Sequence, residues 1–193
     1  MNARKLFIVT IVLCASTLVD AQTKKLTTAE RFKSEYVNKN PQNRIIAGAY
    51  LSDPDPNGAN VRECPGGKVI KVLRTDVEWM IDLHEAWNGW FRINPKIYSE
   101  EADEIDLKTV NCWVHGSILA SSTRNYGGQT LKFYARPDTK SNVNFTVSDE
   151  ISVTFVDIKK GWAQVCYVNK DGKKLIGWIE DKWLCPNPYT TCP

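Results

Sequence analysis

The sequence predicts an all-β protein, built as two small β-barrels in tandem after a short N-terminal helix. One observation behind this is the density of short runs rich in β-branched and aromatic residues, such as 69–73, 151–156 and 162–167. The Asp171-Gly172 pair between two such runs is typical of a hairpin turn. Hydrophobic residues make up 42% of the chain and charged residues 24%, as in folded globular proteins, which argues against disorder.

The other observation is an internal repeat. In each half of the chain a proline is followed 25 residues later by a Gly-Trp strand, and then by a second tryptophan strand. The four tryptophans are Trp90 and Trp113 in the first half, and Trp162 and Trp178 in the second. Because they occupy equivalent positions, we interpret them as structural core. Their large rings supply buried area that a barrel of about 60 residues otherwise lacks.

The first 21 residues have the pattern of a secretory signal peptide. A short basic start is followed by an apolar run over 6–19 and by small residues before Gln22. No other segment is apolar for the length that a membrane span needs. We therefore expect a secreted or periplasmic protein without a transmembrane segment.

A short helix is predicted directly after this leader. Thr27 and Glu30 have the spacing of a capping box, and Ala29, Phe32 and Tyr36 share one helical face. The predicted order is a signal peptide (1–21), an N-terminal helical segment (22–43), a first barrel (44–120), a linker (121–128), a second barrel (129–186) and a C-terminal tail (187–193).

Export permits disulfide bonds, because oxidised cysteine pairs persist outside the cytosol. An odd number of cysteines follows the leader, so at least one is free or pairs between chains, and several pairings stay open. Closeness in the sequence suggests two bridges as hypotheses. Cys185 would pair with Cys192 in the tail, and Cys64 with Cys112 in the first half.

These residues resemble a known family. The series Asp53-Pro-Asp55, Gly58, Asn60-Val61-Arg62 and Pro65-Gly66-Gly67, followed by the two tryptophan strands, is similar to the bacterial Src-homology-3-like (SH3b) domain. The second half matches more loosely, and the first departs from the pattern where Cys112 replaces the usual glycine. The resemblance covers residues 44 to 186. It implies two SH3-like β-barrels that bind cell-wall peptide or glycan, or an envelope protein.

Aromatic residues without an equivalent in the other half are the candidates for a recognition surface. Rings offer a large contact area at a small cost in side-chain entropy, and they stack on sugars and peptides. The candidate ligand-binding residues are Trp79, Trp87, Trp183, Tyr50 and Tyr98.

Two hypotheses about chemistry have plainer alternatives. Asp53, Asp55 and Asn57 have the spacing of a partial calcium loop, but no acid occupies its last position, so we favour an ordinary turn. Cys112 and His115 are the nearest approach to a nucleophile and its base, and we favour a structural cysteine there. We expect no metal or other cofactor, no catalytic residue and no enzymatic activity.

Charge narrows the class of partner. The formal net charge is only +3, from 25 basic and 22 acidic residues, which argues against a nucleic-acid partner. The acidic stretch 100–106 lengthens the first half, and we favour a solvated insertion there over a docking loop.

The sequence therefore predicts an exported, non-catalytic protein that recognises cell-wall peptide or glycan, or an envelope protein, through aromatic side chains. One alternative is a secreted inhibitor or immunity-type partner of an extracellular or periplasmic enzyme. Another is a small hydrolase that acts on the cell wall.

Overall fold

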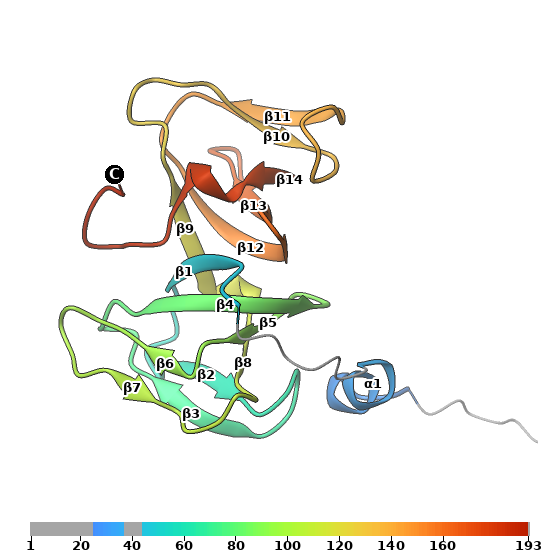
Figure 1. The fold of residues 1–193 in the computed structure, drawn as a ribbon, viewed down its shortest axis with the longest axis vertical. Coiled ribbons are helices and arrows are strands. Elements are labelled where there is room, and N and C mark those ends of the chain that lie inside the picture. Colours follow the sequence, from blue (N-terminus) through green and yellow to red (C-terminus); the bar gives the residue numbers. More distant parts are fainter. Residues whose placement is uncertain (1–24, 37–43, 193) are drawn as a thin grey trace, which may run out of the picture.

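The computed structural model describes residues 25–36 and 44–192, so the predicted signal peptide (1–21) lies outside the described residues. The described chain consists mostly of β-strands and has a short α-helix near its start (Figure 1). The predicted all-β class and the N-terminal helix are confirmed. No helix within the described ranges is long and apolar enough to cross a membrane.

The elements follow one another in two groups. The first group contains α1 (Thr28–Glu35), β1 (Ala47–Leu51), β2 (Ala59–Arg62), β3 (Val69–Leu73), β4 (Met80–Trp87), β5 (Trp90–Ile93), β6 (Lys96–Ile97), β7 (Ile105–Asp106), β8 (Trp113–His115) and the 3-10 helix η1 (Gly116–Ile118). The second group contains β9 (Leu119–Thr123), β10 (Leu131–Tyr134), β11 (Val143–Val147), β12 (Ser152–Lys159), β13 (Trp162–Val168), β14 (Lys174–Glu180), the 3-10 helix η2 (Asp181–Trp183) and β15 (Leu184–Cys185).

The pairing of strands repeats along the chain. The antiparallel series β1-β4-β5-β8 in the first group corresponds to β9-β12-β13-β14 in the second. The register repeats as well, because Ala49 pairs with Ile81 and, 72 positions further along, Ser121 pairs with Val153. The chain therefore contains two copies of one arrangement. We call residues 44–118 the first unit and residues 119–185 the second unit.

Strand β9 joins the two units. It pairs with β1 of the first unit along one edge and with β12 of the second unit along the other. The result is an open sheet in the order β11-β10-β14-β13-β12-β9-β1-β4-β5-β8-β2-β3, with β15 also on β9 and a separate hairpin of β6 and β7. Residues 121–123, which open the predicted linker, lie within β9.

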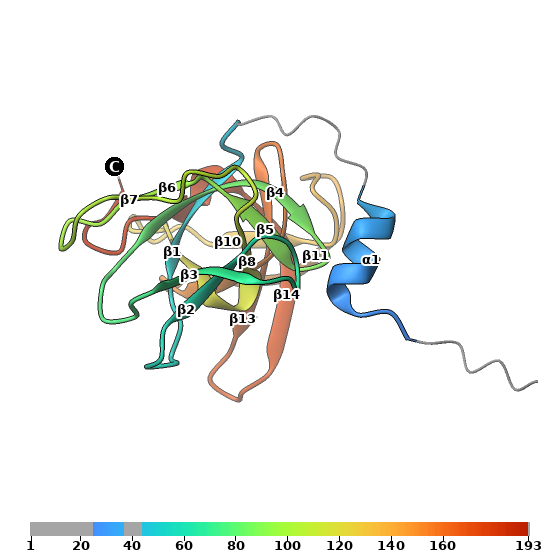
Figure 2. The same cartoon turned by 90° about the horizontal axis from the view of Figure 1, so that it is seen from below.

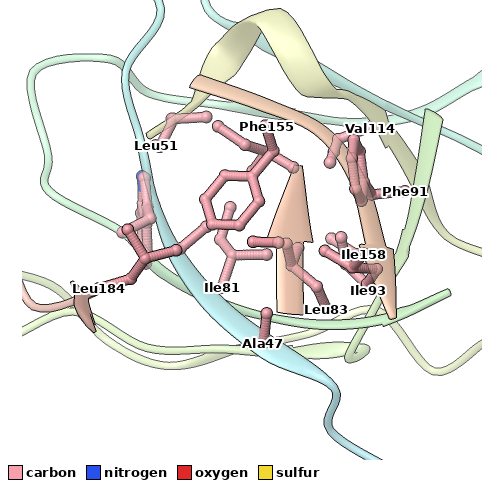
Figure 3. Close-up of a cluster of buried hydrophobic side chains, with 14 of the residues drawn as sticks. Ala47, Leu51, Ile81, Leu83, Phe91, Ile93, Val114, Phe155, Ile158 and Leu184 are labelled. Carbon is pink, nitrogen blue, oxygen red and sulfur yellow. The ribbon is translucent and has the colours of Figure 1, made fainter. Parts of the chain in front are cut away.

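The buried core is continuous between the units. Figure 3 shows Phe91, Ile93 and Val114 of the first unit in one cluster with Phe155 and Ile158 of the second. The rings of Phe91 and Phe155 lie 6.1 Å apart, edge to face. Because apolar burial drives folding, this shared cluster ties the stability of one unit to that of the other.

Gly116 lies where the two units touch. A Cβ atom at this position would lie 2.6 Å from the Phe91 ring and would also collide with the backbone carbonyl of Phe155. The glycine therefore permits the close approach of η1 to β12, and any larger residue would push the units apart.

One of the two predicted disulfides is confirmed. Cys185 and Cys192 are bonded, with 5.5 Å between their Cα atoms, and close the C-terminal loop. The predicted bridge between Cys64 and Cys112 is wrong, because both thiols are free and lie in different apolar clusters. The Cys112 thiol instead donates a hydrogen bond to the carbonyl of Ile93, at 3.2 Å.

Candidate functional site

A groove between α1 and the first unit is the candidate site. Its volume is about 640 Å³, within the range typical of ligand sites. We call it the α1 groove, and its lining residues are Phe32, Lys33, Tyr36, Glu63, Cys64, Ile70, Arg92, Thr109, Asn111 and Trp113. Both ribbon views show α1 standing outside the sheet at its side (Figures 1 and 2).

The sequence specifies α1 through its capping residues. The Thr27 hydroxyl accepts a hydrogen bond from the Glu30 backbone N–H at 3.2 Å. The Glu30 carboxylate in return accepts one from the Thr27 backbone N–H at 2.8 Å. These bonds satisfy backbone donors that would otherwise be exposed at the helix start, as the predicted capping box requires. The helix buries only Phe32.

An aromatic cluster attaches α1 to the first unit. The Phe32 ring lies 5.2 Å from Trp87 and 5.1 Å from Trp113, edge to face in both cases. Tyr36 stacks on Phe32 at 4.4 Å and meets Trp113 at 5.7 Å. The Arg31 guanidinium lies 5.8 Å from the centre of the Trp87 ring. These geometries are the favourable ones for aromatic and cation–π pairs.

A polar chain lies beside this cluster. The Tyr36 hydroxyl donates to the Glu85 carboxylate at 2.7 Å, and Arg92 Nε contacts the same oxygen at 3.2 Å. The Arg92 side chain is 3% exposed, so its charge is held where solvent screens it little. Burial, together with the hydrogen bond to Glu85, raises the pKa of Tyr36 to about 12.

The docking of α1 is expected to weaken as the pH rises from about 10 to about 12. The ordinary pKa of Tyr36 is 10.0 and its value in the folded chain is about 12, so folding favours the protonated hydroxyl. The protonated Tyr36 hydroxyl therefore contributes fully to the docking of α1 below pH 10. This contribution is lost as the pH passes 12. Tryptophan fluorescence followed against pH measures this step. An identical titration in Tyr36→Phe would contradict the assignment.

The predicted ligand-binding aromatics are not brought together. Trp87 contacts Phe32 of α1 but is not among the residues that line the α1 groove. Trp79 does not belong to an exposed surface, because it is 3% exposed and its Nε1 donates to the carbonyl of Arg74. Tyr98 is 39% exposed beside β4, and the half-buried Trp183 lies in η2 near Lys182.

Tyr50 lies at a different cavity. This cavity has a volume of about 380 Å³ and is formed where β1 and β9 meet the C-terminal disulfide loop. The Tyr50 hydroxyl is hydrogen-bonded to the hydroxyl of Ser152 at 3.2 Å. This cavity shares no lining residue with the α1 groove.

The four repeated tryptophans differ in burial. Trp113 is 1% exposed and Trp178 is 5% exposed, whereas Trp90 and Trp162 are half-buried. Trp90 packs against His115 and Trp162 against Tyr134.

The second unit has no counterpart of the α1 groove among its described residues. The pairing of Trp87 with Trp90 corresponds to that of Lys159 with Trp162. The ammonium group of Lys159 lies 5.2 Å from the centre of the Trp178 ring, whereas the Phe32 ring packs against Trp113 in the first unit. An ammonium group in place of a flat indole removes the aromatic surface to which a helix could dock.

Neither the turn at Asp53 and Asp55 nor the pair Cys112 and His115 has the contacts of a chemical site. Asp53 and Asp55 each accept hydrogen bonds from the backbone of the same turn, as turn-forming aspartates do. Within the described residues, no group of three or more His, Cys, Asp or Glu side chains is placed to hold a metal. The His115 ring contacts Ser117 at 2.8 Å, and burial raises the pKa of Cys112 to about 12, which disfavours its thiolate.

The sequence predicts the apolar face of α1 but not the α1 groove that this face helps to form. Nothing in the sequence places Glu85 and Arg92 beside Tyr36, because β4 and β5 bring these residues to α1 only after the sheet has formed. Trp87 has no aromatic equivalent in the second unit. This difference is the feature of the sequence that points to the contact with α1.

Comparison with known proteins gives few matches. No protein-family model matches the chain, and no curated protein matches it. Four chains of solved structures do match, and among the structures are NlpC2 and NlpC1 from Trichomonas vaginalis, each 16% identical with a TM-score of 0.29. The NlpC2 match covers 72% of this chain and 47% of that chain, and the NlpC1 match covers 75% and 46%. The chain thus spans slightly less than half of each.

The expectation that the chain is not an enzyme is corrected by these matches. Both are structures of NlpC proteins, and the expectation of no enzymatic activity is withdrawn. At this TM-score the likeness carries no argument for a particular reaction.

Proposed function

We propose that the chain is an exported binding protein whose two units are SH3b-like barrels and whose α1 groove binds a peptide of the cell wall. The observation that supports the site is the groove itself, in which aromatic rings and opposite charges line one volume of about 640 Å³. The repeated strand pairing of the two units supports tandem modules of one kind.

The lining of the groove favours a peptide over other ligands. Ile70 offers exposed apolar surface beside the buried rings of Phe32 and Trp113. The exposed side chains of Lys33 and Glu63 carry positive and negative charge. A peptide presents apolar side chains together with carboxylate and amino groups, so it complements such a surface. Thr109 and Asn111 add hydrogen-bonding groups that fix orientation.

Ile70→Glu is expected to weaken binding roughly tenfold or more, because it places a charge on the apolar wall of the groove. Val72→Glu is the matched control. Both residues are exposed on β3, at 38% and 47%, but Val72 lines a different hollow. Retention of each variant on purified peptidoglycan measures the effect.

Equal retention of both variants and the wild type would place the ligand elsewhere on the chain. No retention of the wild type, together with capture of one defined protein, would favour a protein-directed function instead.

A further inference from the structure

Among the described residues, no backbone hydrogen bond joins α1 to the first unit. Within the described residues, the backbone hydrogen bonds of α1 stay inside the helix and its caps, such as Arg31 N–H to Thr27 and Tyr36 N–H to Phe32. Phe32 is the buried residue of the helix, and Tyr36 adds the hydrogen bond to Glu85. The sheet strands, by contrast, are joined by continuous ladders of backbone bonds.

A helix of eight residues does not form stably on its own in water, because nucleation is costly and few bonds repay it. Docking of the Phe32 and Tyr36 rings must therefore supply the stability of α1. Folding and docking are then one step, and its reversal leaves the sheet intact. Segments with so few buried contacts lie at the low end of local stability in a folded protein.

The same helix forms one wall of the groove. Phe32, Lys33 and Tyr36 line it from α1, opposite residues such as Ile70 and Arg92 of the sheet. A ligand that touches both walls binds the docked state better than the undocked state, and so shifts the population toward docking.

We infer that α1 is a ligand-coupled flap: it opens by local unfolding, independently of the sheet, and a peptide bound in the α1 groove closes it. This inference rests on the proposed function and specifies how its site is regulated. It applies to the first unit, because in the second unit it is the Lys159 ammonium group that lies over the Trp178 ring.

Hydrogen exchange on the full chain, read by mass spectrometry, tests the flap. Without ligand, the amides of 28–35 are expected to exchange at least about 100-fold faster than those of β13. Muropeptides released from purified peptidoglycan are expected to slow exchange in α1 several-fold and to leave β13 unchanged.

Phe32→Ala supplies the second arm. It removes the buried ring of the flap, so α1 is expected to lose its protection and muropeptide affinity to fall about tenfold. Phe145→Ala is the matched control, because it removes a stacked ring of the second unit, far from the groove. It is expected to leave both exchange in α1 and affinity unchanged.

Three results would overturn the inference. They are exchange in α1 as slow as in β13, no slowing of α1 when muropeptides bind, and full affinity in Phe32→Ala. Failure of the proposed function looks different: the wild type then binds no muropeptide, and the exchange rates of the free protein still decide whether α1 opens independently.

Discussion

Phe155→Ala is expected to destabilise the whole chain by about 3–5 kcal/mol. The Phe155 side chain is 3% exposed and lies in the cluster that both units share, edge to face with Phe91. Its removal leaves a cavity that the surrounding strands cannot fill without breaking the contact between β12 and η1. Urea unfolding followed by circular dichroism and by tryptophan fluorescence measures the loss.

Because the core is continuous, both signals are expected to shift together in one transition. The half-buried Phe145 supplies the control, and its truncation to alanine is expected to cost less. Two separate transitions in Phe155→Ala, with the first unit unaffected, would contradict a shared core.

Trp113→Ala is expected to cost a similar 3–5 kcal/mol and, in addition, to release α1. Trp113 is 1% exposed and contacts both Phe32 and Tyr36, so its ring belongs to the core and to the docking surface at once. Urea unfolding gives the first effect, and hydrogen exchange over 28–35 gives the second.

Trp178→Ala separates these two effects. Trp178 is the equivalent residue of the second unit and is 5% exposed, but the Lys159 ammonium group lies over its ring and no described helix docks on it. The variant is expected to lower the free energy of unfolding while α1 stays protected. Loss of α1 protection in both variants would mean that α1 merely reports global stability.

The all-β class and the repeat could be predicted because they depend on local signals. Strand periodicity, the Asp171-Gly172 turn, where Gly172 adopts a φ of 75°, and the equal spacing from proline to the Gly-Trp strand in both halves are all visible in the sequence itself. The capping box at Thr27 is likewise local, and α1 begins where it predicts.

The role of β9 could not be predicted from such signals. Ser121 and Ser122 open the predicted linker, yet both lie in a strand that pairs on both edges. Ser121 and its neighbour Ala120 are almost fully buried, so this segment belongs to the packed core. Small residues between two units are therefore ambiguous until the pairing is known.

Trp79 illustrates a second limit. It was a candidate for the surface because no tryptophan occupies the equivalent position, which is Ile151 in the second unit. Ile151 is half-buried and packs against the same apolar cluster, so a shared contact with the core was hidden by the difference in residue type. The predicted disulfide between Cys64 and Cys112 was wrong for a similar reason. The two cysteines follow one another in the order of cysteines along the chain, but they belong to separate apolar clusters.

Amide chemical shifts of the labelled full chain, recorded during titration with muropeptides, test the proposed binding site most directly. We expect the largest chemical-shift changes on residues of both groove walls, such as Lys33, Ile70, Thr109 and Asn111. Changes confined to the second unit, or to the cavity at Tyr50 and the disulfide loop, would contradict it.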